Sequence, residues 1–137
     1  MGKKMSPSKE EYLKAIYRLS EKTKFVRSID LADYLSVTRP SVHHAVTALQ
    51  EEGLVVKPLH GEICLTQEGE KQGQIISAKF QLLRQLLIYF CGVNEQTASA
   101  DACKMEHLIS DETTFALKNL LNRVESSSAH AHYKFEK

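Results

Sequence analysis

The stretch that decides the fold is residues 28–56, SIDLADYLSVTRPSVHHAVTALQEEGLVV. Apolar residues recur in it at helical spacing, which predicts a short helix over 28–35 and a second helix over 38–52. Pro40 stands in the first turn of the second helix, where its missing N–H removes no intrahelical hydrogen bond. Because only a tight turn at 36–38 separates the two helices, the stretch predicts a helix-turn-helix.

The second helix of this pair has one apolar and one polar face. Its apolar face carries Val42, Ala45, Val46 and Leu49, so we expect the opposite face to reach solvent. In a helix-turn-helix the second helix enters the major groove of DNA, and its side chains reach the base edges. Each residue of this face is also compatible with an ordinary solvated position. The residues that we expect to contact DNA are Thr38, Arg39, Pro40, Ser41, His43, His44 and Thr47.

Residues 54–56 and 63–66 predict two short strands around a turn, which together form a wing after the second helix. The alternative for this region is a helical domain with an incidental hairpin. Among the expected DNA contacts, Arg39 suits a guanine or a phosphate, and Pro40 suits apolar contact with a thymine methyl group. Further contacts with phosphate groups are expected from Arg27, Lys57 and His60.

Helices are also predicted on both sides of this unit. Residues 6–20 have an amphipathic pattern that begins with Ser6 and Pro7, a common helix start. A long helix is predicted over 66–91, and its second half is apolar on more than one side. Such a helix needs two neighbours, so we expect a second copy of the chain to cover one side through a two-fold interface. A last helix is predicted to begin at Ser110.

A second stretch, CKMEH at 103–107, carries the chemistry. It lies in a predicted helix over 101–109, which places Cys103, Glu106 and His107 on one face within about 5–6 Å of each other. A thiol, a carboxylate and an imidazole together suit a divalent first-row transition metal better than calcium or magnesium. The alternative is a small core cysteine beside a solvated carboxylate and imidazole. An enzyme with Cys103 as nucleophile and His107 as base is a further alternative, but nothing in the pattern supplies an oxyanion hole or a substrate cleft.

Composition limits the classes of protein that the chain can form. With 137 residues, 42% of them hydrophobic, it is long enough for one compact domain or two small ones. Its 18 basic and 17 acidic residues nearly balance, so affinity for DNA must come from a local basic patch. Three cysteines at irregular spacing disfavour a disulfide framework and indicate a reducing compartment. Without a leader-like segment or an apolar run of about 18 residues, we expect a cytoplasmic protein with no membrane partner and no small-molecule substrate.

Several separated stretches of the chain resemble the diphtheria toxin repressor family of metal-dependent transcription regulators. They cover nearly the whole chain to about Val124, and together they are far more specific than any one of them alone. The matching stretches are EEYLKAIY at 10–17, PSV at 40–42, EGLV at 52–55, LTQEG at 65–69, DACKMEH at 101–107 and SDE at 110–112.

The resemblance implies a mainly α fold with a small β-wing, in which a winged helix-turn-helix at 1–66 precedes a helical metal-binding and dimerisation domain at 67–137. It also implies a homodimer that binds Fe(II) or Mn(II), binds palindromic operator DNA and represses genes for metal uptake. A metal held by ligands from both domains would tie the DNA-binding unit to the dimerisation unit. The positions that match the family's main metal site are Glu11, Cys103, Glu106 and His107.

Some positions depart from the family pattern. Iron-type members usually carry Met, and manganese-type members Asp, where Glu11 stands; manganese-type members also carry Glu at the positions of Lys14 and Cys103. We therefore expect one metal per chain, and we do not expect the additional small β-barrel domain of longer members. At the positions of a His in the long helix and of further second-site ligands, this chain has Phe80, Arg84 and Ser99.

The mixed donor set also orders the candidate metals. Ligand softness favours Fe(II) over Mn(II), while Zn(II), Co(II) and Ni(II) are expected to bind as surrogates. Because the binding forms are thiolate and neutral imidazole, metal affinity should fall as the pH drops towards about 6. The alternative within this architecture is a winged-helix regulator with a structural or degenerate metal site, insensitive to metal supply. The tail after about residue 126 is predicted to be disordered, and its His130 and His132 either bind metal or lie in the frayed end.

Overall fold

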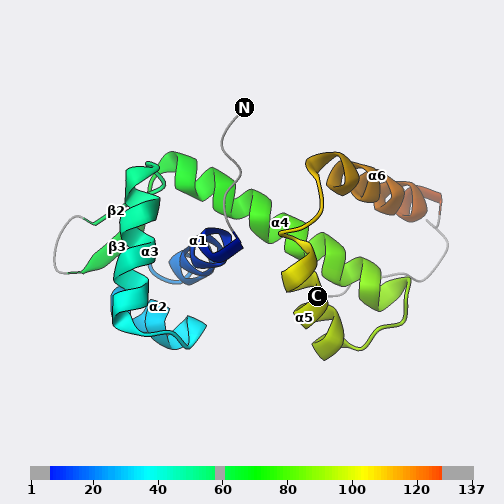
Figure 1. The fold of residues 1–137 in the computed structure, drawn as a ribbon. Coiled ribbons are helices and arrows are strands. Elements are labelled where there is room, and N and C mark those ends of the chain that lie inside the picture. The colour runs from blue at the N-terminus through cyan, green and yellow to red at the C-terminus, as the bar shows by residue number, and fades with distance from the viewer. Residues whose placement is uncertain (1–6, 58–60, 128–137) are drawn as a thin grey trace. The chain divides into compact units, whose positions relative to one another are not determined.

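The computed structural model describes residues 7–57 and 61–127 (Figure 1). It divides into two compact units, Met1–Ser77 and Ala78–Lys137, and the long helix α4 contributes to both. The mainly helical fold with its small antiparallel sheet confirms the predicted fold class. The elements in chain order are α1 (Pro7–Ser20), β1 (Val26–Arg27), α2 (Ser28–Leu35), α3 (Arg39–Glu51), β2 (Val55–Val56), β3 (Glu62–Leu65), α4 (Gln67–Tyr89), α5 (Glu95–Met105) and α6 (Asp111–Ser127).

The turn between α2 and α3 is built from local hydrogen bonds. Ser36 ends α2 in a left-handed backbone conformation with φ 55°, and its N–H donates to the carbonyl of Asp33 at 3.3 Å. Thr38 caps α3, because its Oγ1 accepts a hydrogen bond from the Ser41 N–H at 3.2 Å. Pro40 follows in the first turn of α3. The predicted helix-turn-helix is therefore confirmed.

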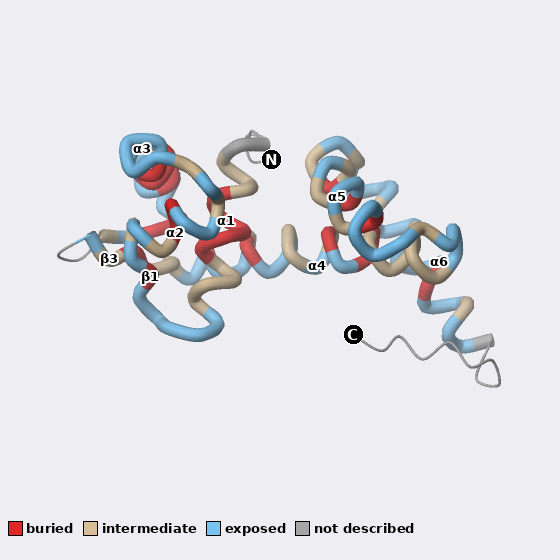
Figure 2. Tube along the Cα trace, turned by 90° about the horizontal axis from the view of Figure 1, so that it is seen from below, coloured by how far each residue is buried: buried red, intermediate tan, exposed pale blue. Residues whose placement is uncertain are grey.

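The helices α1, α2 and α3 share one apolar core in the first unit. Figure 2 shows buried positions along α1 and on the inner side of α3. Leu13 and Ile16 of α1, Leu31 of α2, and Val42 and Val46 of α3 are all fully buried. Because the apolar side of α3 is held in this core, its polar side faces outward.

A three-stranded antiparallel sheet completes the first unit, with the strands in the order β1-β3-β2. The pairing of Val55 in β2 with Leu65 in β3 forms the predicted wing. The sequence did not indicate β1, because a strand of two residues is too short to show an alternating pattern. Its pairing with β3, together with a 3.2 Å hydrogen bond from Ser28 Oγ to the Gly61 carbonyl, ties the start of α2 to the wing.

The first turns of α4 pack closely against the first unit. Thr66 caps the helix, because its Oγ1 accepts a hydrogen bond from the Gly69 N–H at 3.0 Å. A Cβ at Gly69 would overlap the Leu54 carbonyl oxygen, and a Cβ at Gly73 would lie 2.8 Å from the Cβ of Tyr17. Glycine at these two positions therefore allows α4 to lie close to the backbone of Leu54, just before β2, and to the side chain of Tyr17 on α1.

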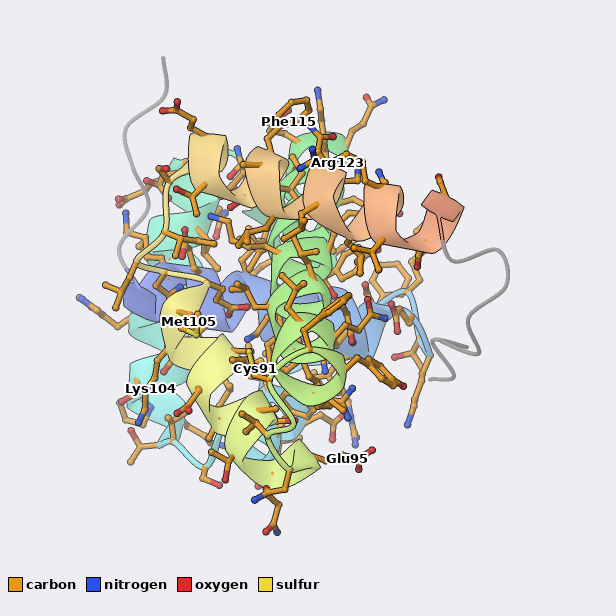
Figure 3. The ribbon with its side chains drawn as sticks, turned by 90° about the vertical axis from the view of Figure 1, so that its right-hand side faces the viewer. Cys91, Glu95, Lys104, Met105, Phe115 and Arg123 are labelled. Carbon is orange, nitrogen blue, oxygen red and sulfur yellow. The ribbon has the colours of Figure 1, made fainter. Side chains whose placement is uncertain are left out.

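The second unit packs α5 and α6 with the C-terminal part of α4. Phe80 and Leu83 of α4 and Ala102 of α5 are buried in its core, and Met105 and Leu117 pack against them. On the opposite side of α6, Phe115 projects outward with 66% of its surface exposed (Figure 3).

α5 begins earlier than the sequence indicated. A helix was predicted over 101–109 after a segment of unassigned structure, whereas one continuous helix runs from Glu95 to Met105. Asn94 caps its start, because the side-chain Oδ1 accepts a hydrogen bond from the Thr97 N–H at 2.9 Å. Figure 3 shows Glu95 and Met105 at the two ends of this helix.

The end of α5 also corrects the prediction, because Glu106 and His107 lie after the helix rather than inside it. The N–H of His107 donates to the Lys104 carbonyl at 3.3 Å, three residues back, so the last turn is tighter than an α-helical turn. The following backbone is held by Lys79, whose Nζ donates to the carbonyl of Ile109 at 3.4 Å.

Within the described residues, every helix is too short or too polar to span a lipid bilayer.

Candidate metal centre and nucleic-acid interface

The metal-binding motif lies at the C-terminal end of α5 and in the turn that follows. The Sγ atom of Cys103 and a carboxylate oxygen of Glu106 lie within 4.8 Å of each other. The Nε2 atom of His107 lies 3.5 Å from Oε1 of Glu106. The early end of the helix therefore does not separate the three groups. The tail residues His130 and His132 lie outside the described part of the chain.

The donors of this motif fit a divalent transition metal. Glu106 is 1% exposed, and the side chain of His107 is 8% exposed. A buried carboxylate is costly unless charged or polar partners compensate it, and a bound cation is one such partner. In a site that excludes water, the attraction between the cation and its ligands is stronger than at the surface. A thiolate, a carboxylate and an imidazole are also the ligand types that first-row divalent ions accept.

Glu11 belongs to the first unit, where it lies on α1. Its Oε1 lies 3.3 Å from the Nζ atom of Lys14, one helical turn further along. The side chain of Lys14 is only 10% exposed and that of Glu11 is 31% exposed. From the sequence, Lys14 was identified only as a departure from the family pattern. Its i, i+3 spacing from Glu11 is nevertheless a signal that an ammonium group stands next to this carboxylate.

Phe80, Arg84 and Ser99 stand where the resemblance to the family places ligands of a second metal, and in this structure they make other contacts. Phe80 is buried in the core of the second unit. Nε of Arg84 donates a hydrogen bond to Oγ of Ser99 at 3.0 Å, and its guanidinium lies 3.8 Å from the carboxylate of Glu95. Because a guanidinium is a donor with no lone pair to offer, Arg84 joins α4 to α5 but cannot ligate a metal.

The residues predicted to contact bases lie on the outer side of α3 and at its start. Val42, Ala45, Val46 and Leu49 face the core, as the apolar pattern predicted. The exposed residues are Thr38, Arg39, Pro40, Ser41, His43, His44 and Thr47.

The three hydroxyl groups of this outer face already make hydrogen bonds within the protein. Thr38 Oγ1 caps α3 and donates to Oγ of Ser41 at 2.9 Å. Thr47 Oγ1 donates to the carbonyl of His43 at 2.8 Å. Thr38 is thus committed to the helix start, while Thr47 keeps its methyl group for apolar contact with a thymine.

The predicted phosphate contacts differ in their surroundings. The guanidinium of Arg27 is exposed and makes two hydrogen bonds to the carboxylate of Asp30, at 3.0 and 3.2 Å. This hydrogen bonding, together with the negative charge of Asp30, raises the pKa of Arg27 above its ordinary value. Arg27 therefore stays charged, but Asp30 partly neutralises it. Lys57 is half-buried after β2, and His60 lies outside the described residues.

A cleft of about 550 Å³ opens between α1 and α3, next to the predicted recognition face. This cleft was not predicted from the sequence, because only the fold brings Lys9 of α1 beside α3. The ammonium group of Lys9 lies beside the recognition helix, but Oε1 of Glu52 lies 2.9 Å from its Nζ atom and partly neutralises its charge. The cleft is lined by Lys9, Tyr12, Pro40, Ser41, His44, Ala45 and Ala48.

These features define the class of the protein. A winged helix-turn-helix with an outward polar face on α3 is the architecture of a DNA-binding regulator. A helical unit in which Cys103 and His107 lie beside the buried carboxylate of Glu106 adds a candidate metal centre to it.

Comparison with known protein families gives the same class of protein and identifies the family. Residues 4–59 match the N-terminal DNA-binding domain of the iron-dependent repressor family, and residues 66–132 match its metal-binding and dimerisation domain. The chain therefore belongs to this family, that of diphtheria toxin repressor, as its sequence motifs predicted. The family consists of metal-dependent transcription regulators, which are not enzymes, so the alternative with Cys103 as a nucleophile is excluded.

Individual relatives cover most of the chain. It is 32% identical over 120 residues to an HTH-type transcriptional regulator of Methanocaldococcus jannaschii, which covers 87% of this chain and 96% of the relative. It is 29% identical to the diphtheria toxin repressor of Corynebacterium diphtheriae over 86% of this chain and 52% of the relative. The solved structure of the manganese regulator SloR superimposes with a TM-score of 0.76 at 31% identity, over 86% of this chain and 55% of that one. The chain thus spans about half the length of the last two proteins.

Proposed function

We propose that the protein is a metal-activated transcriptional repressor that binds palindromic operator DNA as a homodimer and controls genes for metal uptake. The observation that carries this proposal is that Cys103, Glu106 and His107 lie together at the end of α5 and in the turn after it, in a chain that also has an outward recognition helix. Residues 1–66 act as the DNA-binding domain and residues 67–137 as the metal-binding and dimerisation domain. The site of action is the cytoplasm, where thiols stay reduced.

In this proposal Glu11 is the fourth ligand of a single metal ion. It belongs to the first unit, whereas the three other ligands belong to the second. An ion bound by all four side chains restrains the two units relative to each other, and its binding free energy favours the arrangement in which DNA is bound. Metal supply then controls repression without a second metal site.

Fe(II) is the metal that the donor set favours. The thiolate of Cys103 is a softer ligand than the carboxylates of Glu11 and Glu106, and softness disfavours Mn(II) relative to Fe(II). Mn(II) is the second choice, since relatives of this chain include regulators named for manganese. The affinity order of divalent ions also lets Zn(II), Co(II) and Ni(II) bind as surrogates in solution.

The DNA contacts divide into base reading and phosphate binding. Arg39 is exposed at the start of α3 and suits a guanine, while Pro40 and Thr47 offer apolar contact to thymine methyl groups. A homodimer presents two recognition helices related by a two-fold axis, so its operator has matching half-sites about one helical turn apart. The remaining base contacts in this proposal come from Thr38, Ser41, His43 and His44, and the phosphate contacts come from Arg27, Lys57 and His60.

The test is anaerobic fluorescence anisotropy with DNA from upstream of the protein's own gene. Fe(II) and Mn(II) are titrated separately into the metal-free protein and into Cys103→Ala. We expect both metals to tighten DNA binding, and we expect the variant to lose the response to iron because its thiolate ligand is gone.

The matched control is Cys91→Ala, which removes an exposed cysteine outside the motif and should keep the full metal response. DNA binding of equal strength without metal would instead identify a constitutive winged-helix regulator in which the end of α5 is structural. Loss of the response in both cysteine variants would show that the assay reports general thiol chemistry rather than this site.

A further inference from the structure

Lys14 is a buried lysine in the middle of α1. The residue is 8% exposed, and its neighbours Leu13 and Ala15 are 0% and 1% exposed. Lysine is among the residues least often buried, because its ammonium group loses hydration. The ammonium group lies 3.3 Å from Oε1 of Glu11, so the proposed metal ligand has a cation beside it.

The ion pair with Glu11 gives little stability in return for the burial of Lys14. An i, i+3 ion pair on a helix contributes only a few tenths of a kcal/mol. Replacing a buried ionic group with an apolar side chain of similar volume is often neutral or stabilising. A methionine at position 14 would keep a similar volume without the charge, between Leu13 and Ala15, which are both buried. We therefore look for a role of the ammonium group in function.

We infer that Lys14 is a built-in cation that competes with the metal for Glu11 and thereby sets the metal concentration at which the protein responds. The inference rests on the proposed function, in which Glu11 is a metal ligand. It concerns a residue of this chain that is not itself a ligand, because a lysine ammonium has no lone pair.

Competition follows from either way in which a metal can use the Glu11 carboxylate. If the metal takes the oxygen that faces Lys14, the ion pair breaks and a buried ammonium group loses a partner. If the metal takes the other oxygen, a divalent ion and an ammonium group share one carboxylate and repel each other. Both routes lower the affinity of the site for its metal ion. The second route also disfavours the binding of another cation next to Glu11.

The inference predicts that removing the charge tightens metal binding. Lys14→Met should bind Co(II) about ten- to a hundred-fold more tightly than the wild-type protein, because like charges a few ångströms apart repel strongly in a partly buried site. Lys14→Arg keeps the charge and should stay within about three-fold of the wild type. The metal-free affinity for DNA should stay the same in both variants, which separates a metal-site effect from a general change in α1.

The measurement is a titration of the full-length protein with Co(II), whose absorption bands report thiolate ligation, with the stoichiometry read from the end point. The wild type, Lys14→Met and Lys14→Arg are compared with Glu11→Gln and Cys103→Ala, and thermal unfolding is recorded for each. Lys14→Gln serves in place of Lys14→Met if the methionine variant does not fold.

The outcomes separate this inference from the proposed function. One Co(II) per chain, weaker binding by Glu11→Gln and tighter binding by Lys14→Met support both. Weaker binding by Glu11→Gln without tighter binding by Lys14→Met overturns the inference about Lys14 and leaves the four-ligand site intact. Unchanged binding by both Glu11→Gln and Cys103→Ala overturns the proposed site, and the inference about Lys14 falls with it.

Discussion

Replacing Gly69 with alanine tests the close approach of α4 to the first unit. A Cβ at this position would overlap the Leu54 carbonyl oxygen and lie 2.8 Å from the carbonyl carbon. The optimal separation of non-bonded carbon atoms is about 3.5–4.0 Å, so the helix or the carbonyl must move by about an ångström. The carbonyl cannot turn away without loss, because it accepts a hydrogen bond from the Thr66 N–H at 3.0 Å.

Two effects of this substitution oppose each other. Alanine in place of glycine stabilises a helix by at most about 1 kcal/mol, because the unfolded chain has less backbone freedom to lose. Overpacking costs about 1–3 kcal/mol, and weakening the hydrogen bond between Thr66 and Leu54 costs about 1 kcal/mol more. The steric cost is larger than the gain, so Gly69→Ala should lower the free energy of unfolding by about 1–3 kcal/mol.

Urea denaturation followed by circular dichroism measures this change. The control is Gln74→Ala on the same helix, where the side chain is exposed and the change should stay within about 0.5 kcal/mol. Because the chain has two compact units, the transition of the first unit is the one to compare. If Gly69→Ala is as stable as the wild type, α4 does not pack against Leu54 as described.

Three other outcomes test the recognition helix and the metal centre. Thr38→Ala should lower the free energy of unfolding by about 1 kcal/mol through loss of the α3 cap, and Thr38→Ser should restore it; equal stability of all three proteins in urea would contradict the cap. Arg39→Ala should weaken operator binding by about 1–3 kcal/mol and relax specificity at one base pair, measured by anisotropy on single-base operator variants. An equal loss on every operator variant would assign Arg39 to a phosphate instead. The affinity for Co(II) should fall between pH 8 and about pH 6 as the cysteine and histidine ligands gain protons, and a flat competition titration over this range would count against the site.

Local patterns were sufficient to predict the first unit. The cap at Thr38, the proline at position 40 and the apolar spacing of α3 are interactions within one helix or between adjacent turns, so the sequence displays them directly. The alternation of the wing strands is a local pattern as well, although β1 is too short to show one. The family resemblance rested on motifs of this local kind.

The features that sequence reasoning missed depend on tertiary contacts or on competition between local signals. The end of α5 was predicted too late, because residues 103–109 contain no glycine or proline that would mark the end of a helix. In the structure the helix ends before Glu106, and Lys79 of α4 donates a hydrogen bond to the carbonyl of Ile109 in the segment that follows. The place of Lys9 beside α3 and the burial of Lys14 cannot be read from spacing, since both depend on how α1 packs. The grouping of Cys103, Glu106 and His107 could be predicted because the three donors are close in sequence. Metal binding by these residues and by Glu11 is a proposal.

The near balance of charge in the chain explains why a metal ion can act as an effective switch. With a net charge of +1, the protein has little general attraction for DNA, and Asp30 further offsets the charge of Arg27. In the proposed function, binding then depends on a few contacts made in both half-sites of the operator at once. The second DNA-binding unit of the dimer adds affinity only if it is aligned with its half-site. A homodimer has one such metal site in each chain, so the free energy that each bound metal contributes to alignment is gained twice. A metal that favours the aligned arrangement by about 1.4 kcal/mol, or ten-fold, in each chain would tighten operator binding about a hundred-fold. If the proposed function and the competition by Lys14 are both correct, a metal site of reduced affinity is enough for control, and it would release the DNA when the metal concentration falls.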